Sequence, residues 1–309
     1  MASVKKCGFV ALMGRPNAGK STLMNALVGR KLAAVSRKPQ TTRNPIQGIV
    51  TTTKTQMIFV DTPGLHRLRK NETMMNAAMN KEAWRGGDEA DAVVYLISCV
   101  EGWHREDAAH LQRLLEAGGR PPLVFLSQVD RIPAEAVRAK LTTIQQEIAE
   151  ALPEETPPIV VQPLSAKRRE HLQDFCDGLA AVLPEAEEFL YPEDYDSDRP
   201  VSFYCGELIR EQVFRQMGKE IPHQCGVLVE QYEDKGDLVV INAKIITARE
   251  NHKGMVVGQK GRRIKEIGIA ARQALEKFLE QKVHLELLVS VDRDWFNRPQ
   301  AIKEIVGLE

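Results

Sequence analysis

Short apolar runs alternate with longer amphipathic segments through about residue 183. Most of the runs are almost continuously apolar, as in parallel strands that are buried on both faces. The predicted strands are residues 7–13, 56–60, 92–97, 123–126 and 159–161, and the predicted helices start near Lys20 or cover residues 71–84, 105–116, 134–151 and 170–183. This alternation predicts a doubly wound α/β domain with a mostly parallel sheet.

The pattern changes after an acidic segment bounded by Pro184 and Pro200, which is typical of an interdomain linker. Beyond it, we expect a helix over 201–217, strands over 224–231 and 238–247 around a turn at 233–237, helices over 248–257 and about 262–280, and a strand over 284–291. The order αββααβ predicts a small α+β domain. The chain is therefore expected to contain a first domain at residues 1–184, an acidic linker at 185–200 and a second domain at 201–309.

Overall composition narrows the function little. The 42 Lys and Arg residues balance the 42 Asp and Glu residues, so net charge points to no class of partner and local charge has to be considered instead. The five cysteines form no CxxC pair, which favours reduced thiols in a cytoplasmic protein. No apolar stretch approaches the roughly 18 residues needed to span a bilayer. Peripheral membrane contact stays open.

A phosphate-binding loop is predicted directly after the first strand. Gly14 to Ser21 fits the pattern GxxxxGK[ST], with an apolar strand before it and an amphipathic helix after it. Glycines allow main-chain N–H groups to approach phosphate oxygens, Lys20 would neutralise the β- and γ-phosphates, and the Ser21 hydroxyl would bind Mg²⁺. The expected nucleotide contacts here are Gly14, Arg15, Pro16, Asn17, Ala18, Gly19, Lys20, Ser21 and Thr22.

Two further segments supply groups for the metal and the γ-phosphate. Asp61 follows an apolar strand, where its carboxylate would reach Mg²⁺, and Gly64 would offer its main-chain N–H to the γ-phosphate. The segment Gln40-Thr41-Thr42-Arg43 lies between them in sequence. Thr42 is expected to close over the nucleotide and bind Mg²⁺ only when the γ-phosphate is present, as in an order–disorder switch.

The base site departs from the usual GTPase pattern. Ser165, Ala166 and Lys167 follow a strand and are expected to offer a main-chain N–H to the guanine oxygen. The partner motif should be Asn-Lys-x-Asp, but the chain has Ser127, Gln128, Val129 and Asp130. Asp130 can accept hydrogen bonds from guanine N1 and N2, whereas a serine is too short to replace an asparagine amide. We expect guanine binding that is weaker or less selective.

A second glycine loop lies in the C-terminal domain. Gly258-Gln259-Lys260-Gly261 falls between two predicted helices, and a GxxG loop of this kind can clamp a single-stranded RNA backbone. Cations cluster around the loop. The expected RNA-binding residues are Lys253, Gly258, Gln259, Lys260, Gly261, Arg262 and Lys265.

These motifs together resemble the Era family of bacterial GTPases over nearly the whole chain. The segments that carry the resemblance are residues 14–21, 40–43, 61–66 and 165–167, the linker residues 192–195, and residues 256–268 and 284–287 of a KH-type RNA-binding domain. The resemblance implies a GTP-dependent switch that binds small-subunit ribosomal RNA near its 3′ end and assists assembly of the 30S subunit. It also implies a cytoplasmic monomer, with peripheral association with the inner membrane in some members.

The resemblance also suggests how hydrolysis proceeds. Leu65 occupies the position at which small GTPases carry a water-orienting glutamine, so slow intrinsic hydrolysis is expected. Asn17 matches an asparagine that helps bind K⁺ beside the phosphates in related GTPases. The residues expected to take part in hydrolysis are Asn17, Lys20, Thr42 and Gly64, with Ser21, Thr42 and Asp61 holding Mg²⁺.

Two other functions are compatible with parts of the sequence. A nucleotide-dependent metabolic kinase would need an acceptor pocket and a lid, and the segments around Asp61 and Ser165 argue against it. A nucleotide-bound RNA-binding scaffold with little hydrolysis is the other alternative, because the altered base motif weakens the case for an efficient GTPase.

Overall fold

The computed structural model describes residues 4–35, 46–65, 73–117, 121–218 and 221–306. The chain divides into two compact units. The first contains Met1–Leu32, Pro45–Leu68 and Asn80–Asp198, and the second contains Ala33–Asn44, Arg69–Met79 and Arg199–Glu309. Thr42 and the rest of residues 40–43 lie outside the described residues.

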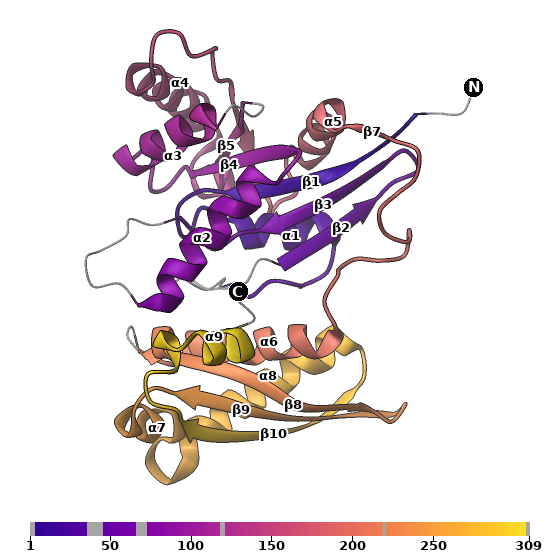
Figure 1. The fold of residues 1–309 in the computed structure, drawn as a ribbon, viewed down its shortest axis with the longest axis vertical. Coiled ribbons are helices and arrows are strands. Elements are labelled where there is room, and N and C mark those ends of the chain that lie inside the picture. Colours follow the sequence, from indigo (N-terminus) through magenta and orange to yellow (C-terminus); the bar gives the residue numbers. More distant parts are fainter. Residues whose placement is uncertain (1–3, 36–45, 66–72, 118–120, 219–220, 307–309) are drawn as a thin grey trace. The chain divides into compact units, whose positions relative to one another are not determined.

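The first unit is built on a mostly parallel sheet with strand order β2-β3-β1-β4-β5-β6 (Figure 1). The strands are β1 (Lys5–Met13), β2 (Ile46–Thr51), β3 (Thr55–Asp61), β4 (Ala92–Ser98), β5 (Leu123–Ser127) and β6 (Val161–Leu164). Strand β2 is antiparallel to β3, and the short β7 (Glu185–Ala186) is antiparallel to β1. All seven residues of β3 are buried, as expected for a strand covered on both faces. The predicted α/β class is confirmed.

Among the described residues, five helices lie between successive strands of this sheet. They are α1 (Lys20–Val28), α2 (Met74–Asp88), α3 (Arg105–Glu116), α4 (Ala134–Ala151) and α5 (Leu172–Val182), with a 3₁₀ turn at Val129–Arg131. A capping box opens α3, in which the His104 side chain accepts from the main chain of Glu106 and the Asp107 side chain accepts from the His104 N–H. Phe175 of α5 is buried against Phe59 and Phe125 of the sheet, with ring centroids 6.1 and 5.0 Å apart.

Two local expectations for this unit were wrong, and one strand was missed. Strand β2 was not predicted, and the strand expected at 159–161 instead starts at Val161, because pairing with β5 begins there. Helix α2 was expected to end at residue 84 but continues to Asp88 through two glycines. A Cβ on Gly87 would lie 2.6 Å from the Met13 sulfur, so the glycine permits close packing of the helix on the sheet.

Part of the acidic segment expected to be a linker pairs with the first unit. The Asp196 carbonyl accepts from the Ile49 N–H at 2.9 Å, and the Asp196 carboxylate forms an ion pair with Arg30 at 2.9 Å. The Gln56 side chain also bonds both main-chain groups of Tyr191 at 2.9 Å. These contacts attach residues 191–196 to strands β2 and β3 and to the loop after α1.

The second unit has a three-stranded sheet of order β10-β9-β8. Its elements are α6 (Val201–Gln216), β8 (Cys225–Asp234), β9 (Leu238–Thr247), α7 (Glu250–Val257), α8 (Arg262–Leu279), β10 (Lys282–Val291) and α9 (Pro299–Val306), with 3₁₀ turns at Ile221–Gln224, Gln259–Gly261 and Trp295–Asn297. Strands β8 and β9 are antiparallel, whereas β10 is parallel to β9. The predicted order αββααβ is confirmed, and α9 is an addition that was not predicted.

Within the part of the chain that the structure describes, no helix combines the length and apolarity required to cross a bilayer. All five cysteines are free thiols, and four of them are buried.

Truncation of Phe175 tests the core of the first unit. We expect Phe175→Ala to lower the unfolding free energy of this unit by about 3–5 kcal/mol, because the cavity would lose contacts with two buried rings. Urea unfolding followed by circular dichroism measures the change. Val160→Ala, at a side chain that is 61% exposed, is the control and should change stability by less than about 0.5 kcal/mol. Equal effects of the two substitutions would contradict the packing described for Phe175.

Candidate functional site

The loop between β1 and α1 is bent by residues with left-handed or otherwise positive φ. Gly14 has φ 135°, Asn17 has φ 64° and Gly19 has φ 97°. A Cβ on Gly14 would lie 2.4 Å from the Leu96 carbonyl oxygen, so this position accepts only glycine. Bends of this kind let successive N–H groups face one concave surface, which suits an anion such as phosphate.

Lys20 is held beneath this loop. Its side chain is buried, and Nζ donates to the carbonyl oxygens of Gly14 and Arg15 at 3.0 Å each. Burial lowers the pKa of Lys20 to about 8, while the negative charge of Asp61 acts in the opposite direction. The lysine is thus fixed in the position from which its charge would meet phosphate oxygens.

The segment after β3 lies directly against the phosphate loop. The Thr62 hydroxyl donates to the Leu12 carbonyl at 2.8 Å, and the Leu65 N–H donates to the Gly14 carbonyl at 3.3 Å. A Cβ on Gly64 would lie 2.9 Å from Pro16 Cα and N, so glycine allows the two segments to touch. Asp61 and Ser21 offer hard oxygen donors of the type Mg²⁺ prefers. The third expected ligand, Thr42, lies outside the described residues.

On the base side, Asp130 is oriented by a residue of the predicted 165–167 loop. The buried Ser165 hydroxyl donates to Asp130 Oδ1 at 2.6 Å and accepts from the Arg168 N–H at 3.1 Å. Asp130 is the middle residue of the 3₁₀ turn after β5, and Ser165 follows β6. The two predicted base-binding segments therefore meet through a hydrogen bond between their side chains.

Ser127 and Gln128 face the phosphate loop. The Ser127 hydroxyl lies 2.6 Å from the Ala18 carbonyl and 3.2 Å from the Ile97 carbonyl. Gln128 Nε2 donates to the Asn17 carbonyl at 2.7 Å. The altered pair thus links the end of β5 to the loop that precedes α1.

Residue identities alone did not reveal what holds Arg15. Its guanidinium lies 3.3 Å from Glu101, 4.0 Å from Glu106 and 3.5 Å from Asp107, all at or just before the start of α3. Arg15, a residue expected to contact nucleotide, therefore directs its side chain at carboxylates. The only signal in the sequence was three acidic residues between Glu101 and Asp107.

Asp107 also belongs to a buried polar cluster. The Tyr95 hydroxyl donates to Asp107 Oδ1 at 2.8 Å and lies 2.9 Å from His110 Nδ1. Burial lowers the pKa of His110 to about 4; Glu106 opposes this shift, and Lys20, Arg15 and Arg113 add to it. Burial raises the pKa of Asp107, against the effect of the Tyr95 hydrogen bond and of Arg15. His110 is therefore neutral in the folded protein at neutral pH.

In the second unit, the GxxG loop connects α7 to α8. Gly258, Lys260 and Gly261 all have positive φ, at 72°, 50° and 75°. A Cβ on Gly258 would lie 2.6 Å from Arg263 Cβ, whereas a Cβ on Gly261 would meet no atom within 4 Å. Lys260, Arg262 and Lys265 are exposed and Lys253 is half-buried. Arg262 forms an ion pair with Glu266 at 3.0 Å, so part of its charge is compensated.

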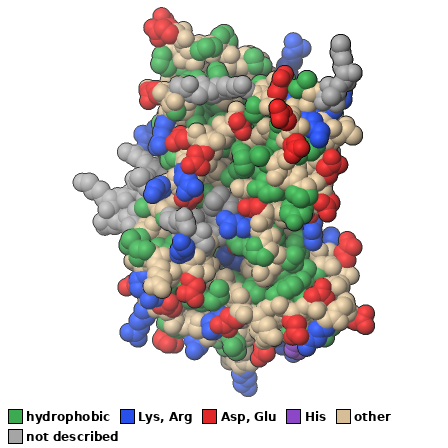
Figure 2. Space-filling view, turned by 45° about the vertical axis from the view of Figure 1, so that its right-hand side comes forward, with side chains coloured by type: hydrophobic (Ala, Val, Ile, Leu, Met, Phe, Trp, Pro, Cys, Tyr) green, Lys and Arg blue, Asp and Glu red, His purple; other side chains and the backbone are tan. Residues whose placement is uncertain are grey.

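Charge elsewhere on the surface is mixed. Figure 2 shows Lys and Arg side chains interspersed with Asp and Glu over the face in view. Any attraction for a polyanion on this surface therefore depends on local groups of cations.

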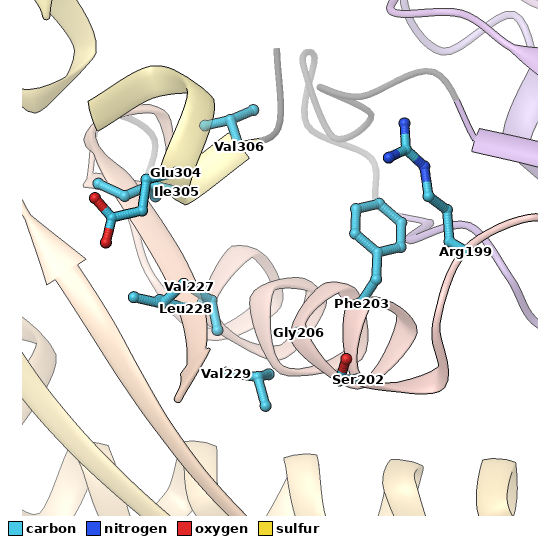
Figure 3. A pocket seen from close by; sticks show the side chains of 10 residues that line it. All are labelled: Arg199, Ser202, Phe203, Gly206, Val227, Leu228, Val229, Glu304, Ile305 and Val306. Carbon is cyan, nitrogen blue, oxygen red and sulfur yellow. The ribbon is translucent and has the colours of Figure 1, made fainter. Parts of the chain in front are cut away.

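A hollow of about 190 Å³ opens in the second unit between α6, β8 and α9. In Figure 3, Arg199 and Phe203 lie at one end, Glu304 lies at the other, and aliphatic side chains of β8 lie between them. The Arg199 guanidinium carbon is 5.6 Å from the Phe203 ring centroid. The lining of this hollow was not predicted, because helix α9 was not predicted. The GxxG residues do not line the hollow.

Comparisons with known proteins match a known domain family in each of the two units. Residues 9–128 match the family described as 50S ribosome-binding GTPase, and residues 220–296 match the KH domain family. The chain is 37% identical to GTPase Era of Pseudomonas fluorescens, covering 98% of this chain and 97% of that protein. The chain belongs to the Era family of GTPases. Era of Xylella fastidiosa is 40% identical, with 96% of each chain covered.

Two solved Era structures match the whole fold. One is an Aquifex aeolicus Era variant bound to GDP·AlF4⁻, with a TM-score of 0.89, 34% identity, and coverage of 98% of this chain and 100% of that chain. The other is Era in complex with MgGDPNP and nucleotides 1506–1542 of 16S ribosomal RNA, with a TM-score of 0.89, 34% identity, and coverage of 99% and 100%. Membership of the Era family identifies this chain as a GTPase and confirms the resemblance inferred from its motifs.

The buried His110 makes stability depend on pH. Because its folded pKa lies below the ordinary value near 6.5, the unfolded chain binds more protons at mildly acidic pH. We expect the unfolding free energy to fall by about 1 kcal/mol between pH 7 and 5.5 on account of this residue. Urea titrations at the two pH values measure the change. The difference in unfolding free energy between the two pH values should shrink in His110→Gln. It should persist in His171→Gln, because the His171 side chain is 50% exposed. An unchanged pH dependence in His110→Gln would contradict this assignment.

Proposed function

We propose that this chain binds GTP with Mg²⁺, hydrolyses it slowly, and binds small-subunit ribosomal RNA near its 3′ end during assembly of the 30S subunit. The observation that carries the proposal is the match over nearly the full chain to Era in complex with MgGDPNP and nucleotides 1506–1542 of 16S ribosomal RNA. We assign nucleotide binding to residues 1–184, RNA binding to residues 201–309, and the connection between them to residues 185–200.

In this proposal, Ser21, Asp61 and Thr42 hold Mg²⁺, which neutralises charge on the β- and γ-phosphates. Lys20 adds a fixed positive charge from beneath the loop, and Gly64 offers its N–H to the γ-phosphate. The buried position of Lys20 and the contact of Gly64 with Pro16 support these roles. Binding of the γ-phosphate would order the segments of Thr42 and Gly64 together.

We propose slow hydrolysis because the residue after Gly64 has no polar side chain. Leu65 is aliphatic and only 1% exposed, so it cannot orient an attacking water. We assign the missing positive charge to K⁺ held with the help of Asn17, whose side chain is exposed. The cation would then serve in place of an arginine finger.

For RNA, the proposal assigns the sugar–phosphate clamp to residues 258–261 and the surrounding attraction to Lys253, Arg262 and Lys265. Exposed apolar side chains on the flanking elements, Met255, Ile269 and Leu288, offer surface for unstacked bases. We also propose that the protein is a monomer in the cytoplasm. Peripheral contact with the inner membrane is part of the proposal.

One experiment tests both activities. Phosphate release from GTP is followed with Mg²⁺, with and without an RNA oligonucleotide of the 16S 3′ end, and RNA binding is measured by fluorescence anisotropy at fixed salt. We expect slow phosphate release and measurable RNA binding. In Lys260→Asp with Gly261→Asp, RNA affinity should fall by more than about tenfold, because charge repulsion and side-chain bulk remove the backbone clamp. Basal phosphate release should persist.

The control for that variant is Lys282→Asp, which makes the same Lys-to-Asp replacement beyond the far end of the 18-residue helix α8, about 27 Å away. Its RNA affinity should stay close to that of the wild type. RNA affinity that survives Lys260→Asp with Gly261→Asp would move the clamp elsewhere, and a failure to release phosphate under any condition would favour a scaffold without turnover.

Potassium dependence is a separate test. We expect phosphate release to be faster in KCl than in NaCl at equal ionic strength, because Na⁺ is smaller and fits a K⁺ site poorly. The difference should disappear in Asn17→Ala. Steady-state release at matched salt concentrations checks this, with Asn251→Ala, at an exposed residue of α7, as the control. Equal wild-type rates in the two salts would rule out the K⁺ role.

A further inference from the structure

Guanine offers two acceptors, O6 and N7, on the edge opposite its N2 amino group. Under the proposed function, Asp130 accepts from N1 and N2, and the main-chain N–H groups of residues 165–167 serve O6. N7 would then depend on a donor from the remaining base-site residues, Ser127 and Gln128. How completely the protein recognises the base therefore depends on whether either side chain can donate a hydrogen bond to N7.

The Ser127 hydroxyl is already engaged on the phosphate loop. It has one proton, which the Ala18 carbonyl receives at 2.6 Å, and the Ile97 carbonyl lies nearby at 3.2 Å. The residue is 5% exposed. Donation to a bound base would require it to leave two buried carbonyl groups, which is unfavourable.

Two hydrogen bonds fix the Gln128 side-chain amide, one through its nitrogen and one through its oxygen. Nε2 donates to the Asn17 carbonyl at 2.7 Å, and Oε1 accepts from Arg131 Nη1 at 2.9 Å. The arginine can only donate, so it sets which end of the amide carries oxygen. A Cβ on Gly19 would lie 3.6 Å from Nε2 and 3.8 Å from Cγ, which places the side chain along the phosphate loop.

Hydrogen bonds also hold the main chain at Gln128 in the conformation from which its side chain reaches Asn17. Gln128 has φ 61°, in the left-handed region that costs energy for a residue with a side chain. The Cys99 thiol donates to the Gln128 carbonyl at 2.9 Å, and the Cys99 N–H donates to the Ser127 carbonyl at 3.0 Å. The end of β4 therefore fixes the turn from which Gln128 reaches Asn17.

From these contacts we propose that Ser127 and Gln128 brace the phosphate loop and that the protein makes no hydrogen bond to guanine N7. Base selection then rests on Asp130, oriented by Ser165, and on the main chain of residues 165–167. This inference rests on the proposed binding of guanine nucleotides and specifies how that site distinguishes bases. Recognition is strict at N1 and N2 and insensitive to the atom at position 7.

The test uses the full chain with Mg²⁺ and competition of diphosphates against a fluorescent GDP. 7-Deaza-GDP, in which a C–H replaces N7, should bind within about twofold of GDP. IDP, which lacks the N2 amino group, should bind at least about tenfold more weakly, because a hydrogen bond to a charged group is lost. A tenfold loss for 7-deaza-GDP would overturn the inference. Failure to bind any guanine nucleotide would overturn the proposed function as well, so the two failures are distinguishable.

Two variants separate bracing from base recognition. Gln128→Ala should weaken GDP and 7-deaza-GDP by the same factor, about three- to tenfold, because the lost bond supports the loop and not the base. Ser127→Asn supplies a longer amide and should create a preference for GDP over 7-deaza-GDP. Gln145→Ala, at an exposed position on α4, is the matched control and should bind both ligands like the wild type. Circular dichroism confirms that each variant is folded.

A Gln128→Ala variant that binds GDP more weakly but 7-deaza-GDP as tightly as the wild type would overturn the inference. That result would mean that the glutamine amide contacts N7.

Discussion

The nucleotide site depends on the position of β1 between β3 and β4 in a parallel sheet. The carboxyl ends of parallel strands meet at one edge, so segments far apart in sequence arrive there together. Gly14 follows β1, Asp61 ends β3, and Ser127 ends β5. A single edge of the sheet therefore provides groups suited to phosphate, metal and base. Every hydrogen bond described between these loops depends on the order of the strands, because that order brings the loops together.

That edge is stabilised by contacts between loops as well as within them. Asn17 and Gln128 both have left-handed backbones, and one hydrogen bond of 2.7 Å joins them. Arg15 is attached to the acidic start of α3 in the same way, through three carboxylates. Conformations that are unfavourable in isolation persist because neighbouring segments determine them. The phosphate loop is thus shaped by its contacts with β4, β5 and α3.

The sequence was most informative where one motif combined a pattern with a special residue. Gly14 to Ser21 sits between a strand and a helix, so both its fold and its chemistry were predictable. Strand β2 was missed because Ile46 to Thr51 is short, polar at Gln47 and interrupted by Gly48. The role of Gln128 was also hidden, because its partners, the Asn17 carbonyl and Arg131, depend on a left-handed backbone that composition does not indicate.

The two glycines of the GxxG loop face unequal evolutionary constraints. At Gly258, any side chain would collide with Arg263 within the unit itself, so the fold excludes every alternative regardless of ligand. At Gly261, a Cβ would meet no atom within 4 Å, so only the backbone angle limits substitution, and asparagine or aspartate tolerates that angle better than other residues do. Drift at the first glycine is therefore opposed by the protein's own packing, and under the proposed RNA binding, drift at the second would be opposed chiefly by the nucleic acid.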